Sequence, residues 1–176
     1  MLNFYSQLSL VKSLNLDFSN FRKFVMNKFF EFNLNVELGE IFNECTAYQI
    51  SIEYLNKALD KSKNLPINKY RLLKAYELRG KSKMFINDWQ QKINEQDWDF
   101  YWKAKKLNYW EAILDFSKAI EIDPKDSFLY FWRGFAYEFL EEYPTAVKDL
   151  KISKQLDPGF TLTTNILDHI KSKGFQ

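Results

Sequence analysis

The sequence contains few of the residues that interrupt helices or that build covalent and metal sites. It has five glycines, four prolines, one cysteine and one histidine in 176 residues. A single cysteine excludes an internal disulfide, and no cluster of His and Cys has metal-ligand spacing. The glycines are isolated, so no glycine-rich phosphate loop is present. The scarcity of helix breakers favours an all-helical chain.

Long apolar runs and a strong net charge are also missing. No stretch of about 18 apolar residues exists, so no transmembrane helix is expected. The start of the chain, MLNFYSQLSLVK, has no basic leader before an apolar run, so no secretion signal is expected. The net charge of +2 is too small to indicate nucleic-acid binding by itself. Together with the single cysteine, these features predict a cytoplasmic protein.

What the chain does contain is an internal repeat with a period of 34 residues. When 93–126 is placed over 127–160, identical residues meet at several positions. These are Tyr109 and Tyr143, Ala112 and Ala146, Asp115 and Asp149, Asp123 and Asp157, and Pro124 and Pro158. A fixed period of this length is typical of stacked helical hairpins, each of which buries one face against the next.

The second copy resembles the tetratricopeptide repeat (TPR), whose pattern is Trp-x2-Leu-Gly-x2-Tyr, then Ala-x3-Phe, then Pro. The matching residues are Tyr130, Arg133, Gly134, Tyr137, Ala146, Leu150 and Pro158. Arg133 stands where the family has leucine. Gly134 and Ala146 are small, as a close crossing of two helices requires, and Pro158 stops the second helix. The resemblance implies an all-α solenoid of helical hairpins whose first helices line a concave groove.

The resemblance predicts a division of the chain into caps and repeats. Residues 1–31 match no repeat and are predicted to form an N-terminal helical cap, although they could instead occupy the protein's own groove. Repeats are predicted at 32–65, 66–92, 93–126 and 127–160, followed by a C-terminal capping helix in 161–176. The unit 66–92 is degenerate, with a first helix over about 67–85 and a short second helix from 87–89. The alternative is one long helix over 88–106.

The implied groove positions are rich in aromatic residues. They are Phe128, Phe131, Trp132, Phe135 and Phe139 in the last repeat, and Trp98 and Tyr101 in the preceding one. The other side of the same helix carries Tyr130 and Tyr137, so this helix is apolar on both sides and needs cover on both. Either the array and its caps cover these rings, or a partner binds there. On the second reading, the chain is a non-enzymatic adaptor for a peptide or another protein.

The segment 61–83 contains eight basic residues and one acid, Glu77. The basic patch predicted within it consists of Lys69, Arg71, Lys74, Arg79, Lys81 and Lys83. Such a patch can meet a phosphate backbone or an anionic surface, or it can pair with acids of a neighbouring helix. A nucleic-acid binder is therefore an alternative function. A small dedicated chaperone or inhibitor of one partner is a third, suggested by the resemblance alone.

The sequence predicts no catalytic, metal or cofactor site. His169 and Cys45 lie far apart in the chain, so a Cys–His pair would need the two ends of the array to meet. Some TPR domains hold a terminal carboxylate with lysine and asparagine at defined groove positions. Here those positions hold Asp97, Trp98, Phe128 and Trp132, so binding of chaperone C-terminal tails is not predicted.

Overall fold

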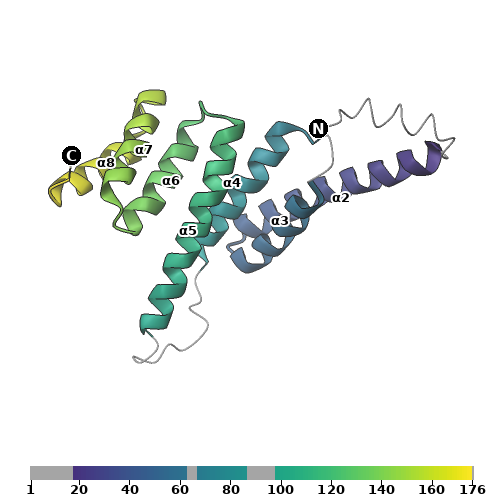
Figure 1. Ribbon diagram of the computed structural model, residues 1–176, viewed down its shortest axis with the longest axis horizontal. Helices are drawn as coiled ribbons and strands as arrows, with labels where there is room; N and C mark the ends of the chain where they lie inside the picture. Colours follow the sequence, from purple (N-terminus) through teal and green to yellow (C-terminus); the bar gives the residue numbers. More distant parts are fainter. Residues whose placement is uncertain (1–17, 63–66, 87–97, 176) are drawn as a thin grey trace.

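The computed structural model describes residues 18–62, 67–86 and 98–175, and every regular element in these ranges is a helix. The helices are α2 (Phe18–Glu44), α3 (Tyr48–Ser62), α4 (Lys69–Phe85), α5 (Trp98–Ile122), α6 (Ser127–Phe139), α7 (Tyr143–Leu156) and α8 (Thr161–Ser172). Figure 1 shows them stacked in chain order, with α2 and α8 at opposite ends. The predicted all-α class and helical-hairpin solenoid are confirmed.

The helices pack as three antiparallel hairpins, α2 with α3, α4 with α5 and α6 with α7, and α8 covers α7. Each hairpin has a glycine in its first helix that closely approaches a large side chain of the second. The pairs are Gly39 with Leu55, Gly80 with Phe116, and Gly134 with Leu150. An added Cβ would lie 2.5 Å from the Leu55 side chain and 2.9 Å from the other two. The glycines therefore set how closely the paired helices approach.

The middle hairpin differs from the pairing that the sequence suggested. α5 is a single helix across most of 93–126, so this segment does not fold back on itself, and its partner is α4. The reason is an insertion. Gly80 and Ala112 are 32 positions apart, whereas Gly134 and Ala146 are 12 apart. The additional residues hide the first helix of this repeat from a search at a fixed period.

The predicted unit boundaries remain a prediction, and two of them can be compared with helix ends. α4 runs from Lys69 to Phe85, close to the first helix expected over 67–85. The turn expected at 87–89 and the short second helix after it lie outside the described residues. The boundary between 31 and 32 falls inside α2, which is continuous from Phe18 to Glu44. Of the predicted N-terminal cap, 1–17 lie outside the described residues.

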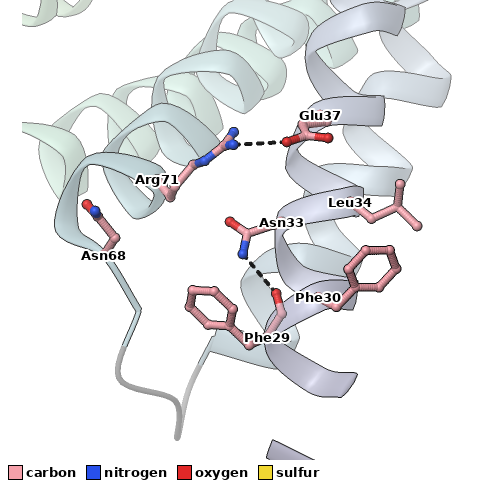
Figure 2. Close-up of a pocket in the computed structure, with 7 residues that line it drawn as sticks. All are labelled: Phe29, Phe30, Asn33, Leu34, Glu37, Asn68 and Arg71. Carbon is pink, nitrogen blue, oxygen red and sulfur yellow. Dashed lines mark hydrogen bonds and ion pairs between the residues drawn. The ribbon is translucent and has the colours of Figure 1, made fainter. Parts of the chain in front are cut away.

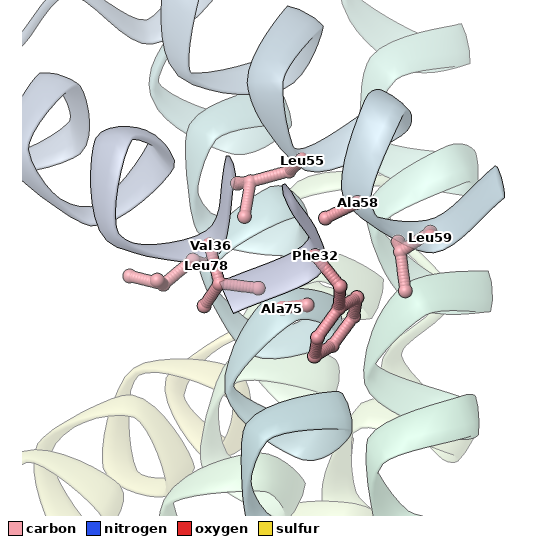
Figure 3. Packing of buried hydrophobic residues seen from close by; sticks show 7 residues of the cluster. All are labelled: Phe32, Val36, Leu55, Ala58, Leu59, Ala75 and Leu78. Atoms are coloured by element: carbon pink, nitrogen blue, oxygen red, sulfur yellow. The ribbon is translucent and has the colours of Figure 1, made fainter. Parts of the chain in front are cut away.

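The core of the first hairpin extends onto the second. Figure 3 shows buried side chains of α2, α3 and α4 meeting between the three helices. They are Phe32, Val36, Leu55, Ala58, Leu59, Ala75 and Leu78. Phe32, Val36 and Leu55 are completely buried, and burial of such a side chain contributes about 1.5–3 kcal/mol. Neighbouring hairpins are therefore joined by shared apolar packing.

The second and third hairpins each contain an arginine–aspartate pair at the same repeat position. Nε and Nη2 of Arg79 donate to Asp115 at 2.9 and 2.6 Å. Nε and Nη2 of Arg133 donate to Asp149 at 2.7 and 2.9 Å. Both aspartate side chains are 4% exposed. Bidentate geometry of this kind fixes the angle between the helices as well as their separation.

The third nitrogen of each arginine reaches the preceding hairpin. Nη1 of Arg79 donates to Oδ1 of Asn56 at 2.7 Å, and Nη1 of Arg133 donates to Oγ of Ser117 at 3.0 Å. Asn56 lies on α3 and Ser117 on α5, each the second helix of its hairpin. Each arginine therefore closes its own hairpin and also ties that hairpin to the one before it.

Candidate functional site

The first helices of the three hairpins present one common side, because equal spacing from the crossing glycine gives equal orientation in stacked repeats. Six positions before each glycine stand Asn33, Lys74 and Phe128. Two positions before it stand Glu37, Leu78 and Trp132. This side is where the family's groove is expected. It is polar on α2, carries Lys74 beside the buried Leu78 on α4, and is aromatic on α6.

At the α2 end, an open depression of about 510 Å³ lies between α2 and the beginning of α4. Its lining residues are Phe29, Phe30, Asn33, Leu34, Glu37, Asn68 and Arg71. In Figure 2, Phe29 and Asn33 point toward α4, whereas Phe30 and Leu34 lie on the far side of α2. Nη2 of Arg71 donates to Oε1 of Glu37 at 2.9 Å. No motif in the sequence indicates this depression, since α2 and α4 meet there only through the stacking of two hairpins.

The predicted basic patch is largely neutralised by acids of the neighbouring helices. Four of its members pair with acids of α2 or α5, and a fifth pairs within α4. The pairs are Arg71 with Glu37, Lys74 with Glu40, Arg79 with Asp115, Lys83 with Asp115 and Glu111, and Lys81 with Glu77. Lys69, the remaining member, is exposed at the first position of α4. This pairing does not favour the nucleic-acid alternative.

Lys74 shows how the acids keep this helix charged. Burial lowers its pKa, but the hydrogen bond that Lys74 donates to Glu40 and the charges of Glu77, Glu40 and Glu44 outweigh that effect, so the pKa of Lys74 is raised. The ammonium is therefore held in its charged form within the fold. The same arrangement makes it less available to an outside anion than an exposed lysine would be.

At the α6 end, Trp132 is the centre of an aromatic cluster. Its ring meets Phe85 edge-on at 5.7 Å and Phe131 at 5.1 Å, and Nζ of Lys81 lies 5.2 Å from its centroid. The indole N–H is buried and has no hydrogen-bond acceptor among the described residues. Phe135 packs beside Trp132 at 6.3 Å. These contacts hold the indole in a fixed place between α4 and α6.

The remaining predicted rings of α6 differ in how far the fold covers them. Phe131 is 4% exposed and Phe128 is 47% exposed. Both contact Phe160, which precedes α8, with ring centroids 4.7 Å apart. Phe139 stacks on Tyr109 of α5 at 3.9 Å. Phe128 is therefore the α6 ring most open to a partner.

Tyr109 is a phenol whose pKa is strongly raised by the fold. Burial, aided by the nearby charge of Glu138, raises the pKa of Tyr109 to about 12. Its ring lies under Phe139 at a packed joint between α5 and α6. A neutral, stacked phenol in this place supports packing and supplies no acid or base near neutral pH.

Two predicted groove residues of the preceding repeat lie elsewhere. Trp98 and Tyr101 belong to α5, the second helix of its hairpin, because the insertion shifts this repeat relative to the 34-residue period. The positions equivalent to Phe128 and Trp132 are therefore on α4, where they hold Lys74 and Leu78. Tyr101 packs on Trp102 at 5.6 Å. The side chain of Trp98 is outside the described part, as is Asp97.

Groups suited to chemistry are dispersed. Cys45 is exposed in the turn after α2, and His169 lies on α8, 3.5 Å from Glu138. In residues 18–62, 67–86 and 98–175, no three His, Cys, Asp or Glu side chains are placed to hold a metal ion. Within those ranges no helix combines the length and apolarity that crossing a bilayer needs.

Comparison with known proteins agrees with the fold. Residues 116–148, from α5 through α6 into α7, match the tetratricopeptide repeat family. The Hsp70-Hsp90 organizing protein of Triticum aestivum is 29% identical over 131 residues, which cover 70% of this chain and 21% of that protein. The chain therefore spans about a fifth of its relative. The family match identifies a tetratricopeptide repeat at the α6 end of the array.

Proposed function

We propose that this chain is a non-enzymatic adaptor that binds a peptide or partner-protein surface along the common side of α2, α4 and α6. The observation that carries the proposal is the aromatic end of this side. Phe128 is 47% exposed there, near the fixed indole of Trp132. Rigid, partly exposed aromatic rings are typical anchors of protein interfaces because they lose little conformational entropy on binding.

The partner's contact has an expected chemistry. An apolar side chain of the partner would pack on Phe128, Trp132 and Phe135, while Phe131 and Phe139 support these rings from within the fold. Lys81 lies beside the indole and forms an ion pair with Glu77 at 2.5 Å. A partner acid near Lys81 would compete with Glu77, so charge would steer binding more than it would strengthen it.

The name of the wheat relative refers to Hsp70 and Hsp90, which raises the tails of those chaperones as candidate partners. The aromatic end does not favour them, since Phe128 and Trp132 stand at positions that bind a terminal carboxylate in some TPR domains. We therefore propose an internal apolar segment as the partner, and a cytoplasmic setting for the complex.

The proposal is tested by selecting a displayed library of random peptides on the purified protein and on two variants. Enrichment of an apolar peptide motif is expected, with loss of at least about tenfold in affinity for Phe128→Ala. Leu114→Ala removes an apolar side chain that is 66% exposed on α5, a second helix outside the proposed site, and should leave the affinity unchanged. No enriched motif, or equal losses in both variants, would contradict the proposed adaptor function.

A further inference from the structure

The outer side of α5 carries a restricted set of exposed residues. Between 101 and 120, every exposed residue is tryptophan, leucine or lysine. They are Trp102, Lys103, Lys106, Leu107, Trp110, Leu114 and Lys118, called the α5 ridge here. The apolar members are 46%, 58%, 44% and 66% exposed in chain order. The ridge is therefore both apolar and basic.

Among the ridge lysines, Lys118 pairs with Glu121 at 2.9 Å, whereas the acids between 101 and 120 pair with residues of α4. Asp115 is buried with Arg79, and Glu111 pairs with Lys83 on α4 at 3.2 Å. Members of the ridge recur every four residues from 102 to 118, which places them along one helical row about 24 Å long. Buried residues such as Ala112 and Phe116 occupy the opposite side of α5.

The next second helix, α7, extends the basic surface. Its exposed lysines are Lys148, Lys151 and Lys154, and its only acid, Asp149, is buried with Arg133. Lys148 follows Leu114 by one 34-residue period, so the two stand on the same side of stacked helices. Lys151 and Lys154 continue the basic surface along α7.

We propose that the α5 ridge and the lysines of α7 dock the protein on the surface of an anionic membrane. Indole rings favour the boundary between headgroups and acyl chains, exposed leucines add apolar area there, and lysines extend to lipid phosphates. Attraction to anionic lipid adds to apolar burial. A protein partner would be expected to meet a compact apolar centre. Here the exposed apolar side chains alternate with lysines along one helix, a mixture that suits the boundary between headgroups and acyl chains. This inference does not depend on the proposed adaptor function.

Vesicle flotation tests the proposal with the full chain. Vesicles of phosphatidylcholine mixed with phosphatidylserine should carry the protein upward, and vesicles of phosphatidylcholine alone should carry much less. Binding should fall as salt is added, because headgroup attraction is screened. Tryptophan emission should shift to shorter wavelength on binding. Equal flotation with both vesicles, or none with either, would overturn the proposal.

Variants separate the two contributions. Lys103→Glu with Lys106→Glu should lower the partition coefficient by at least about tenfold. Leu107→Gln with Leu114→Gln keeps the charge and should also lower it, by about threefold or more, since two exposed apolar groups are lost. If the charge reversal impairs folding by circular dichroism, Lys103→Gln with Lys106→Gln replaces it.

The matched control is Lys23→Glu with Lys69→Glu, which changes the charge equally on α2 and α4. This control should bind as the unmodified protein does. An equal loss in the control would show that net charge alone matters and would overturn the proposal. Full competition by soluble heparin, with no effect of the leucine variant, would also overturn it, because the surface would then bind soluble polyanions or acidic proteins.

Discussion

Replacing Arg133 with leucine should destabilise the protein strongly, even though leucine is the family's residue at this position. The substitution removes two hydrogen bonds to Asp149 and one to Ser117. It leaves the Asp149 carboxylate, 4% exposed, without its cation. Breaking a buried pair from one side costs about 3–5 kcal/mol. The Arg133 side chain is 20% exposed, so we expect the lower end, about 3 kcal/mol.

Removing both members of the pair should cost much less. The first hairpin has Leu38 and Tyr54 at the equivalent positions, which shows that this fold accepts an apolar pair there. Arg133→Leu with Asp149→Leu should therefore lie within about 1 kcal/mol of the unmodified protein, because no charge is left buried. The double variant should thus recover most of what the single variant loses.

The measurement is urea unfolding followed by far-UV circular dichroism, with thermal unfolding beside it. A loss of 3 kcal/mol corresponds to a Tm lower by about 6–12 °C for a chain of this size. The control is Lys118→Ala, which breaks the exposed pair with Glu121 and should leave the stability nearly unchanged. If the double variant is as unstable as Arg133→Leu, the loss comes from packing and our reasoning about the buried charge is wrong.

Three further predictions concern packing, helix ends and pH. Gly39→Ala should cost about 1–3 kcal/mol in urea unfolding, because its Cβ would lie 2.5 Å from Leu55; unchanged stability would show that Leu55 moves freely. Lys105→Met should cost a similar amount by removing the donor to two carbonyls at the end of α4, seen as a lower Tm. Asp126→Ala should cost about 1 kcal/mol by removing the N-cap of α6, whereas Asp126→Asn keeps it. Burial raises the pKa of Asp126 above 3.8, so the contribution of this residue to stability falls as the pH rises from 3.8 through the raised pKa. Over this pH window, the Tm of Asp126→Asn should fall less than the Tm of the unmodified protein.

The repeat was predictable from the sequence where its spacing is regular and was missed where it is not. Gly134 and Ala146 are 12 positions apart, as are Gly39 and Ser51, and both hairpins were found. Gly80 was overlooked because its partner helix follows after an insertion. The match of Asp115 with Asp149 was visible, but the arginines they bind, 54 positions apart, do not share the 34-residue period.

The candidate site was only partly predictable for a different reason. The density of aromatic residues on α6 identified a helix that needs cover on two sides. Which of its rings are buried depends on Phe160 and α5, which pack against α6 only in the folded array. The charge of the basic patch is largely neutralised by ion pairs with Glu37, Glu40 and Asp115 on other helices. Charge counted along one segment cannot include acids that stacking brings beside it.

The long connection between Gly80 and Ala112 has a consequence for how this chain can change in length. This span is 20 residues longer than the one between Gly134 and Ala146, and part of the difference is helix, because α5 already begins at Trp98. The crossing at Gly80 is nonetheless as close as the one at Gly134. The junction of α4 and α5 is thus a natural place to graft a tag or a whole domain without disturbing the solenoid.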